Sequence, residues 1–442
     1  MKNPLNKRFK RELISDFGKN LALFLFLTLT IAFSAGYLVC EDSLIYAFDT
    51  GYEKYNIEHG HFALSKPLSQ SLKKELEKLK EEEWSIKSDS IPLETELSSL
   101  KKDIENAKKF GAEGVGLCRT EHMFMDPDRL PWVQKMIIAT TTEARKEALS
   151  HLLPMQYSDF YSMFKALGDK PLTVRLLDPP LHEFLPSKIE LVEKVATKKA
   201  LGQDYSEDEK MLAIVENLSE SNPMMGLRGC RLGLTYPEIN EMQVRAIFEA
   251  CCDLTKEGHH IQPWIMIPLI GHINELKTAK ATLVAVAEQV MQEKGIKVDY
   301  KFGTMIEIPR AALTADEVAT EAEFFSYGTN DLTQMTYGYS RDDAEGKFLK
   351  NYVEQKILPS NPFMTLDTKG VGRLIEMSIN EGRAVNSRLV GGICGEHGGD
   401  PDSVKFAHRI GLNYVSCSPF RIPQAKLAAA QAVIESKQVA KV

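Results

Sequence analysis

The chain has 442 residues, of which 43% are hydrophobic and 26% are charged, so it is long enough for two or three domains or for one large barrel with an appendage. Its formal net charge of −7, without a concentrated basic stripe in the body of the chain, argues against a general nucleic-acid binder. The seven cysteines form no CxxC pair, which argues against a zinc knuckle, and their odd number fits a reducing compartment.

The first element in chain order is an uncharged run at residues 21–40, which reads LALFLFLTLTIAFSAGYLVC. About 20 helical residues span about 30 Å, the thickness of a bilayer core. Several lysines and arginines precede the run, and Glu41 and Asp42 follow it, so the positive-inside rule places the N-terminus in the cytoplasm. We therefore expect a single transmembrane helix at residues 21–40; a buried core helix and an uncleaved signal peptide are the alternatives.

The next stretch carries little pattern. Residues 65–83 form a charged run typical of an exposed helix or a solvated linker, and residues 89–100 are polar without a period. We therefore divide the chain into an N-terminal membrane-anchor segment at residues 1–100, with a short α/β or irregular part, and a second domain at residues 101–442.

From residue 101 onward, short apolar runs alternate with longer helical patterns, for example at residues 236–255, 274–294 and 370–387. Repeated strand–helix units imply a parallel sheet. About eight units in about 340 residues predict an α/β fold of the closed (β/α)₈ TIM-barrel type rather than an open sheet. The predicted strands are residues 114–118, 172–176, 225–229, 264–269, 304–308, 324–327, 390–394 and 414–417.

The predicted strands turn polar where they end, and in such a barrel the carboxyl ends of the strands carry the chemistry. A purely structural barrel would not need three arginines and two carboxylates at one rim. Gly328 would let the backbone approach a ligand closely. The polar and thiol side chains at these ends are Arg119, Arg175, Arg228, Glu307, Asn330, Asp331 and Cys394.

Six blocks of this region resemble the phosphoenolpyruvate/pyruvate-binding barrel of the pyruvate phosphate dikinase family. They occur in the family's order and run from about Ala107 to Ala432, roughly three quarters of the chain. Phosphoenolpyruvate synthase and enzyme I of the sugar phosphotransferase system share the barrel, but the second block and Cys394 are more similar to the dikinase. The blocks are GAEGVGLCRTEHMF (111–124), RLLDPPLHEFLP (175–186), NPMMGLRGCRL (222–232), IEIPRAAL (306–313), FFSYGTNDLTQMT (324–336) and GICGEHGGDP (392–401).

The resemblance implies a phosphotransferase that depends on Mg²⁺ and moves a phosphoryl group between phosphoenolpyruvate and a phosphohistidine. Such a reaction passes through an enolate, which needs cationic clamps, a metal and a proton donor. Arg119, Arg175 and Arg228 are the implied clamps, because guanidinium groups pair bidentately with phosphate and carboxylate. A structural ion pair is the alternative for each.

Glu307 and Asp331 are the implied metal ligands, because Mg²⁺ takes a few hard oxygens and leaves room for substrate and water. The resemblance further implies that Asn330 donates a hydrogen bond to a substrate oxygen. Gly328 and Thr329 would contribute backbone contacts to the same substrate.

Cys394 is ambiguous by residue type alone. The usual role of a free cysteine is that of a small buried hydrophobe. A thiol with a tuned pKa can also exchange a proton with the methyl carbon of pyruvate, and the resemblance implies this acid/base role for Cys394.

The sequence also departs from the family. A full dikinase has a nucleotide-binding domain and a phosphohistidine domain ahead of the barrel; neither is found here, so we expect another chain to supply the phosphohistidine. The family also has a strand just before the helix that contains Ala107, where this chain reads SLKKDIENAKKF. We therefore expect a barrel that lacks its first strand or is open or strained at that seam.

The N-terminal segment resembles a different family. NPLNKRFKRELISDFGKNLALFLFLTLT and YEKYNIEHGHFALSK are similar to the start of an FtsX-like permease, and the chain looks like a junction of two partial genes. The barrel chemistry is expected in the cytoplasm and in a homodimer, with membrane anchoring if residues 21–40 insert. Two alternatives remain: an enzyme I-like phosphotransferase acting on a carrier protein, and a non-catalytic membrane-tethered module that binds phosphoenolpyruvate or pyruvate.

Overall fold

The computed structural model describes residues 85–89 and 97–439. All of them belong to the second of two compact units, Ser69–Val442. The predicted membrane helix at residues 21–40 and the permease-like segment lie outside the described residues. Among the helices that are described, none is long and apolar enough to cross a membrane.

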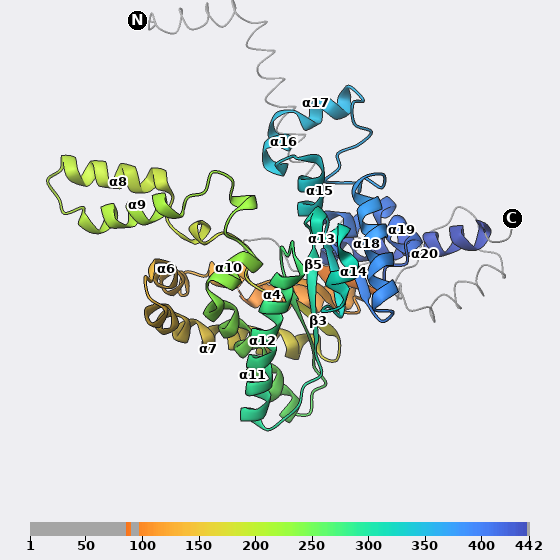
Figure 1. The fold of residues 1–442 in the computed structure, drawn as a ribbon, viewed down its shortest axis with the longest axis horizontal. Coiled ribbons are helices and arrows are strands. Elements are labelled where there is room, and N and C mark those ends of the chain that lie inside the picture. The colour runs from red at the N-terminus through yellow and green to blue at the C-terminus, as the bar shows by residue number, and fades with distance from the viewer. Residues whose placement is uncertain (1–84, 90–96, 440–442) are drawn as a thin grey trace, which may run out of the picture. The chain divides into compact units, whose positions relative to one another are not determined.

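Eight parallel strands close a barrel in sequence order, and Figure 1 shows several of them with the surrounding helices. The parallel α/β barrel expected from the sequence is therefore confirmed. The strands are β1 Ser85–Asp89, β2 Val115–Arg119, β3 Pro171–Arg175, β4 Gln262–Ile267, β5 Lys301–Ile306, β6 Phe324–Gly328, β7 Val390–Cys394 and β8 Tyr414–Cys417.

One predicted strand was wrong. The run at residues 225–229 is not a strand: Met225 ends the short 3₁₀ helix η2 (Pro223–Met225), and a turn follows it. Its glycines explain the error: the N–H of Arg228 donates to the carbonyl of Gly226 at 3.1 Å, and Gly229 has a φ of 58°, which belongs to the left-handed region and not to a strand.

The one strand that the sequence analysis did not predict, β1, comes from a stretch that we assigned to the N-terminal segment. Strand β1 reads SIKSD and pairs in parallel with β8 through four residue pairs, from Ser85 opposite Tyr414 to Ser88 opposite Cys417. Its other edge pairs with β2, with a register shift between Ser88 and Asp89. The expectation of a missing first strand was therefore wrong: the seam is closed, and the irregular register marks its position.

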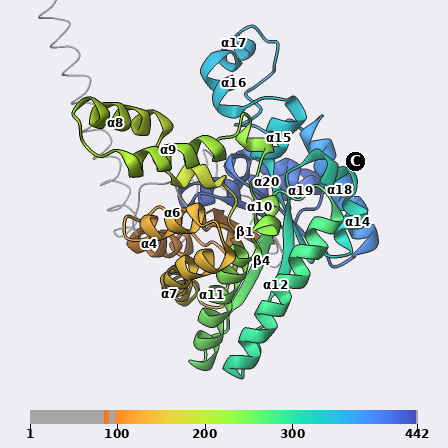
Figure 2. The same ribbon diagram turned by 60° about the vertical axis from the view of Figure 1, so that its left-hand side comes forward.

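The helices that cover the barrel follow the strands along the chain. Helices α11 and α12 pack side by side along the outside of the barrel (Figures 1 and 2). The outer helices are α4 Leu97–Lys109, α7 Thr142–Leu167, α11 Pro237–Lys256, α12 Ile273–Lys294, α13 Pro309–Leu313, α14 Ala315–Ala319, α18 Val371–Val385, α19 Pro401–Arg409 and α20 Ile422–Val439.

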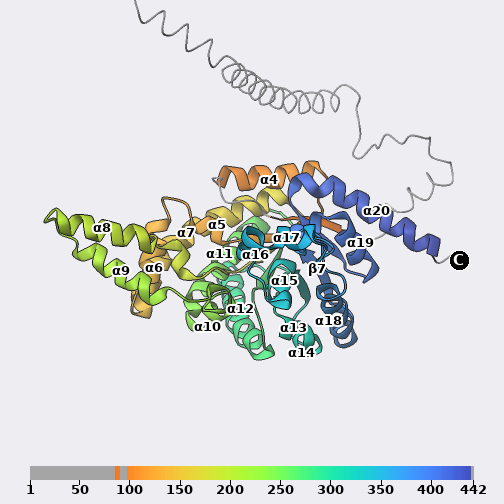
Figure 3. The same ribbon diagram turned by 90° about the horizontal axis from the view of Figure 1, so that it is seen from above.

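Further short helices lie in the loops that connect strands to these helices. A helical pair, α8 and α9, extends away from the strands, and a small lobe with α16 and α17 follows β6 (Figures 1 and 3). These elements are α5 Glu121–Phe124, α6 Leu130–Ile138, η1 Leu181–Phe184, α8 Lys188–Ala200, α9 Ser206–Leu218, α10 Cys230–Thr235, α15 Thr329–Tyr337, α16 Arg341–Lys347, α17 Leu349–Glu354, η3 Glu396–Gly399 and η4 Pro419–Arg421.

Alternate residues of each strand point to opposite faces, so the barrel has two cores. On β4, Ile265 and Ile267 join the large cluster between strands and helices, whereas Trp264 and Met266 join a smaller cluster within the barrel. The interior cluster also contains Cys394, which places this thiol at the end of a filled barrel rather than in a pore.

Removing β1 should destabilise the barrel. A chain that lacks residues 1–90 leaves the facing edges of β2 and β8 without partners, whereas a chain that lacks residues 1–68 keeps β1. We expect the shorter chain to melt more than about 5 °C below the longer one, because several backbone hydrogen bonds of about 1 kcal/mol each are lost. Circular dichroism melts of the two chains make the comparison; equal midpoints would contradict the closure of the barrel by β1.

Candidate active site

The structure places the candidate residues at one end of the barrel. Arg119, Arg175 and Cys394 are the last residues of β2, β3 and β7. Glu307 directly follows β5, and Gly328 ends β6 and leads into α15. Because the strands are parallel, these residues share the rim formed by the carboxyl ends.

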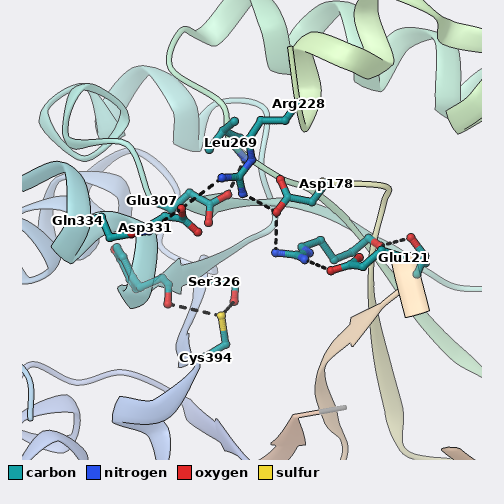
Figure 4. A network of polar contacts seen from close by, with 12 residues as sticks. Glu121, Asp178, Arg228, Leu269, Glu307, Ser326, Asp331, Gln334 and Cys394 are labelled. Carbon is teal, nitrogen blue, oxygen red and sulfur yellow. Dashed lines mark hydrogen bonds and ion pairs between the residues drawn. The ribbon is translucent and has the colours of Figure 1, made fainter. Parts of the chain in front are cut away.

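Asp178 links two of the predicted arginines. Its Oδ2 atom lies 3.0 Å from Nη1 of Arg175 and 2.6 Å from Nη2 of Arg228 (Figure 4). Arg175 also donates to Glu121, at the start of α5. Since the Asp178 side chain is only 5% exposed, one buried carboxylate holds both guanidinium groups in place.

The charges of this group support one another. Burial alone would raise the pKa of Asp178, but Arg175 and Arg228 hold it below the usual value. Burial alone would lower the pKa of Arg175, but Asp178 and Glu121 raise it above the usual value. All three groups therefore remain charged at neutral pH.

The loop that carries Arg228 is fixed by backbone contacts as well. The N–H of Gly229 donates to the carbonyl of Asp178 at 2.8 Å. A Cβ on Gly229 would lie 2.7 Å from Cβ of Leu269, so only glycine fits where this loop meets the end of β4. The loop that we mistook for a strand thus positions Arg228 against Asp178.

Glu307 is fully buried, and only one of its oxygens has a partner. Its Oε1 accepts a hydrogen bond from the N–H of Leu269 at 2.7 Å, whereas Oε2 has none. Leu269 reaches this position with a φ of 62°, a conformation rare for a branched residue and typical of functional sites. Burial, together with Asp331 and Asp178, raises the pKa of Glu307 to about 8.

Asp331 lies in the first turn of α15 and shares Arg228 with Asp178. Its Oδ1 is 3.4 Å from Nη1 of Arg228 and accepts from Nε2 of Gln334 at 3.3 Å (Figure 4). Burial raises the pKa of Asp331, and Arg228 opposes this rise. Asp331 and Glu307 are therefore two carboxylates whose negative charge is incompletely balanced.

This arrangement fits a divalent cation. Three arginines face four carboxylates at this rim, and three of the carboxylate oxygens, Oε2 of Glu121, Oδ1 of Asp178 and Oε2 of Glu307, are buried without a hydrogen-bond partner. Among the described residues no group of three or more histidine, cysteine or acidic side chains could hold a metal by itself. A cation held here would thus take two carboxylates, Glu307 and Asp331, and oxygens from a substrate or water, as Mg²⁺ commonly does.

Gly328 and Thr329 make close contacts within the protein. A Cβ on Gly328 would lie 2.4 Å from Oε2 of Glu307, so this glycine makes room for the Glu307 carboxylate. The hydroxyl of Thr329 lies 3.0 Å from the carbonyl of Cys394 and 2.7 Å from Nδ1 of His397. Both residues therefore have packing or hydrogen-bonding roles within the protein, and their contact with a ligand stays a prediction.

The Cys394 side chain sits between β6 and β7. Its thiol lies 3.5 Å from the hydroxyl of Ser326 and 3.6 Å from the carbonyl of Tyr327, and Figure 4 shows Ser326 and Cys394 pointing toward one another. The residue is 2% exposed. These contacts hold the thiol in a nearly buried position.

Three contributors escaped the sequence analysis. Asp178 stands three residues after Arg175, and a search for acidic residues just beyond strand ends would have found it. Leu269 acts through its backbone, which leaves no signal in the residue type. Gln334 stands one helical turn after Asp331, where it is indistinguishable from an ordinary helix residue.

Comparison with known proteins identifies the family. Residues 74–434 match the family described as "PEP-utilising enzyme, PEP-binding domain". The chain belongs to this family. The expected resemblance of the barrel is thereby confirmed; the match does not extend to the permease-like segment, whose likeness stays a prediction.

The relatives of this PEP-binding domain include several dikinases. It is 56% identical to pyruvate, phosphate dikinase of Clostridium symbiosum over 80% of this chain and 40% of that protein. It is 56% identical to the chloroplastic pyruvate, phosphate dikinase of Flaveria pringlei over 75% of this chain and 34% of that protein. It is 52% identical to pyruvate, phosphate dikinase of Entamoeba histolytica over 76% of this chain and 38% of that protein. The chain thus spans at most two-fifths of these relatives' length.

Proposed function

We propose that this PEP-binding domain carries out the phosphoenolpyruvate/pyruvate half-reaction of a dikinase, exchanging a phosphoryl group with a phosphohistidine. The observation that carries the proposal is the Arg175–Asp178–Arg228 group beside two incompletely balanced carboxylates, Glu307 and Asp331. Phosphoenolpyruvate offers the matching groups, a phosphate and a carboxylate for the guanidinium groups and an enol oxygen for a cation.

The arginines bind and orient the substrate. Arg175 and Arg228 are held charged and in place before any ligand arrives, so they lose little freedom on binding. The positive charge of Arg119 also acts on Asp178 and Asp331, which supports a role for Arg119 at the same site. The three guanidinium groups would stabilise the charge that spreads over the phosphoryl oxygens during transfer.

Glu307 and Asp331 would hold Mg²⁺, which when bound supplies positive charge to the enolate and phosphoryl oxygens. During transfer the bond between phosphorus and the enol oxygen breaks, and a bond between phosphorus and an imidazole nitrogen of the histidine forms. The enolate that remains is the anion of pyruvate. Asn330 would donate a hydrogen bond to one of its oxygens.

Cys394 would complete the reaction. Its S–H transfers a proton to the methylene carbon of the enolate and gives pyruvate, and the resulting thiolate regains a proton from solvent. The contacts with Ser326 and the carbonyl of Tyr327 hold the sulfur in one position for this transfer. Operation as a homodimer in the cytoplasm completes the proposal.

Binding of phosphoenolpyruvate should require a divalent cation. We expect calorimetry to give a binding signal in Mg²⁺ and none in EDTA. Glu307→Ala should weaken binding in Mg²⁺ by at least about 10-fold, because one of two protein ligands is lost. Glu354→Ala, on exposed α17, is the matched control and should bind as the parent does. Equal affinity with and without metal would remove the metal role from Glu307 and Asp331.

Proton exchange should depend on Cys394. In deuterium oxide the parent protein should exchange the methyl protons of pyruvate, which NMR follows. Cys394→Ala should slow this exchange by about 100-fold or more, because a proton donor acts on the barrier, while leaving the affinity for oxalate nearly unchanged. Exchange at the parental rate in the variant would show that another group transfers the proton.

A further inference from the structure

Arg341, the first residue of α16, is tied to two amide side chains of α15. Its Nη1 donates to Oδ1 of Asn330 at 3.0 Å, and its backbone N–H donates to Oε1 of Gln334 at 2.7 Å. Neither the expected catalytic chemistry nor the charge group around Asp178 uses Arg341. It nevertheless contacts the residue that we expect to hydrogen-bond the substrate.

The chemistry of the contacts fixes which way each amide points. A guanidinium group carries only donors, so the atom of Asn330 that faces Arg341 must be its carbonyl oxygen. The NH₂ end of Asn330 is then the end that remains for a ligand. Without Arg341, the Asn330 side chain loses this hydrogen bond and could turn its oxygen toward the ligand or swing away from it.

The second amide, that of Gln334, holds the backbone of Arg341 in place. The backbone N–H of Arg341 is also only a donor, so Gln334 must turn its Oε1 toward it. The NH₂ end of Gln334 is then free to donate to Oδ1 of Asp331, at 3.3 Å. The backbone of Arg341 is therefore hydrogen-bonded to α15, the same helix that carries Asn330.

The rest of the lobe supports the guanidinium group. Nε of Arg341 lies 3.4 Å from Oε2 of Glu345, and its guanidinium carbon lies 5.8 Å from the ring centroid of Phe363. Phe363 packs with Ala344 and Leu349 in a small core of its own. Contacts with Glu345 and Phe363 thus hold the Arg341 side chain beside Asn330.

We propose that Arg341 is a positioning residue that fixes Asn330 with its NH₂ end toward the substrate. The proposal rests on the proposed function, because it assumes that Asn330 donates to an oxygen of phosphoenolpyruvate or of the enolate. It implies that the lobe after β6 favours a ligand with a hydrogen-bond acceptor next to the NH₂ end of Asn330. A ligand with a hydrogen-bond donor at that point would bind less well.

A double-mutant cycle on the full chain tests the proposal, with calorimetry of oxalate and phosphoenolpyruvate in Mg²⁺. Arg341→Ala should weaken binding by about 5- to 10-fold, the size of one ordinary hydrogen bond. Asn330→Ala should cost at least as much, and the double variant should bind no more weakly than Asn330→Ala. Arg341→Lys keeps a donor and should recover part of the loss.

Two further variants separate positioning from a general structural effect. Glu345→Ala removes the ion pair on the other side of Arg341 and should stay within about twofold of the parent. Asn330→Asp still accepts from Arg341 but has no donor, so it should bind as weakly as Asn330→Ala. Thermal melts confirm that each variant is folded.

The outcomes distinguish this inference from the proposed function. If the parent protein binds neither ligand in Mg²⁺, the proposed function itself fails. If the parent binds and Arg341→Ala remains within about twofold of it, or weakens Asn330→Ala further by its full factor, Arg341 does not act through Asn330 and the inference is overturned.

Discussion

The carboxylate of Asp178 is the interaction on which the geometry of the site depends. It lies between Arg175 and Arg228, with its Oδ2 atom within hydrogen-bonding distance of both guanidinium groups. Buried charges are costly to leave poorly paired, and without Asp178 the two arginines would depend on Glu121 for Arg175 and on Asp331, at 3.4 Å, for Arg228. The backbone of Asp178 also anchors the loop that carries Arg228, through its carbonyl and the N–H of Gly229. One residue thus supports both the charge and the position of the two arginines.

The balance of charge explains why a substrate and a cation would bind together. The carboxylates of Glu121, Asp178, Glu307 and Asp331 outnumber the three arginines, and burial raises the pKa of Glu307 to about 8. At neutral pH without a cation, Glu307 is therefore mostly protonated, and the other three carboxylates only balance the arginines. A divalent cation between Glu307 and Asp331 would displace this proton and add net positive charge for a phosphorylated acid, so each ligand favours the other, as linkage requires.

Most of the fold and part of the candidate site could be predicted from the sequence. Apolar runs such as those of β4 and β6 correctly predicted seven of the eight strands, because buried strands are the densest apolar segments of a barrel. Strand β1, SIKSD, has one apolar residue and is held by backbone pairing, so no pattern marked it. Residues 225–229 have a strand-like composition, but their glycines bend the chain. The contacts of Asp178 and Arg341 depend on which loops meet in space, and the role of Cys394 came from the family resemblance alone.

The affinity of Asp178→Asn for phosphoenolpyruvate in Mg²⁺ tests the central claim most directly, because two explanations of the role of Asp178 predict opposite changes in affinity. If Asp178 serves to hold Arg175 and Arg228 in place, the variant should bind phosphoenolpyruvate about 10-fold or more weakly, although it removes a negative charge from an anion site. If the charge of Asp178 merely opposes the ligand, the variant should bind more tightly. Weaker binding by a variant that melts as a folded protein would support the preorganised clamp, and binding as tight as the parent's or tighter would contradict it.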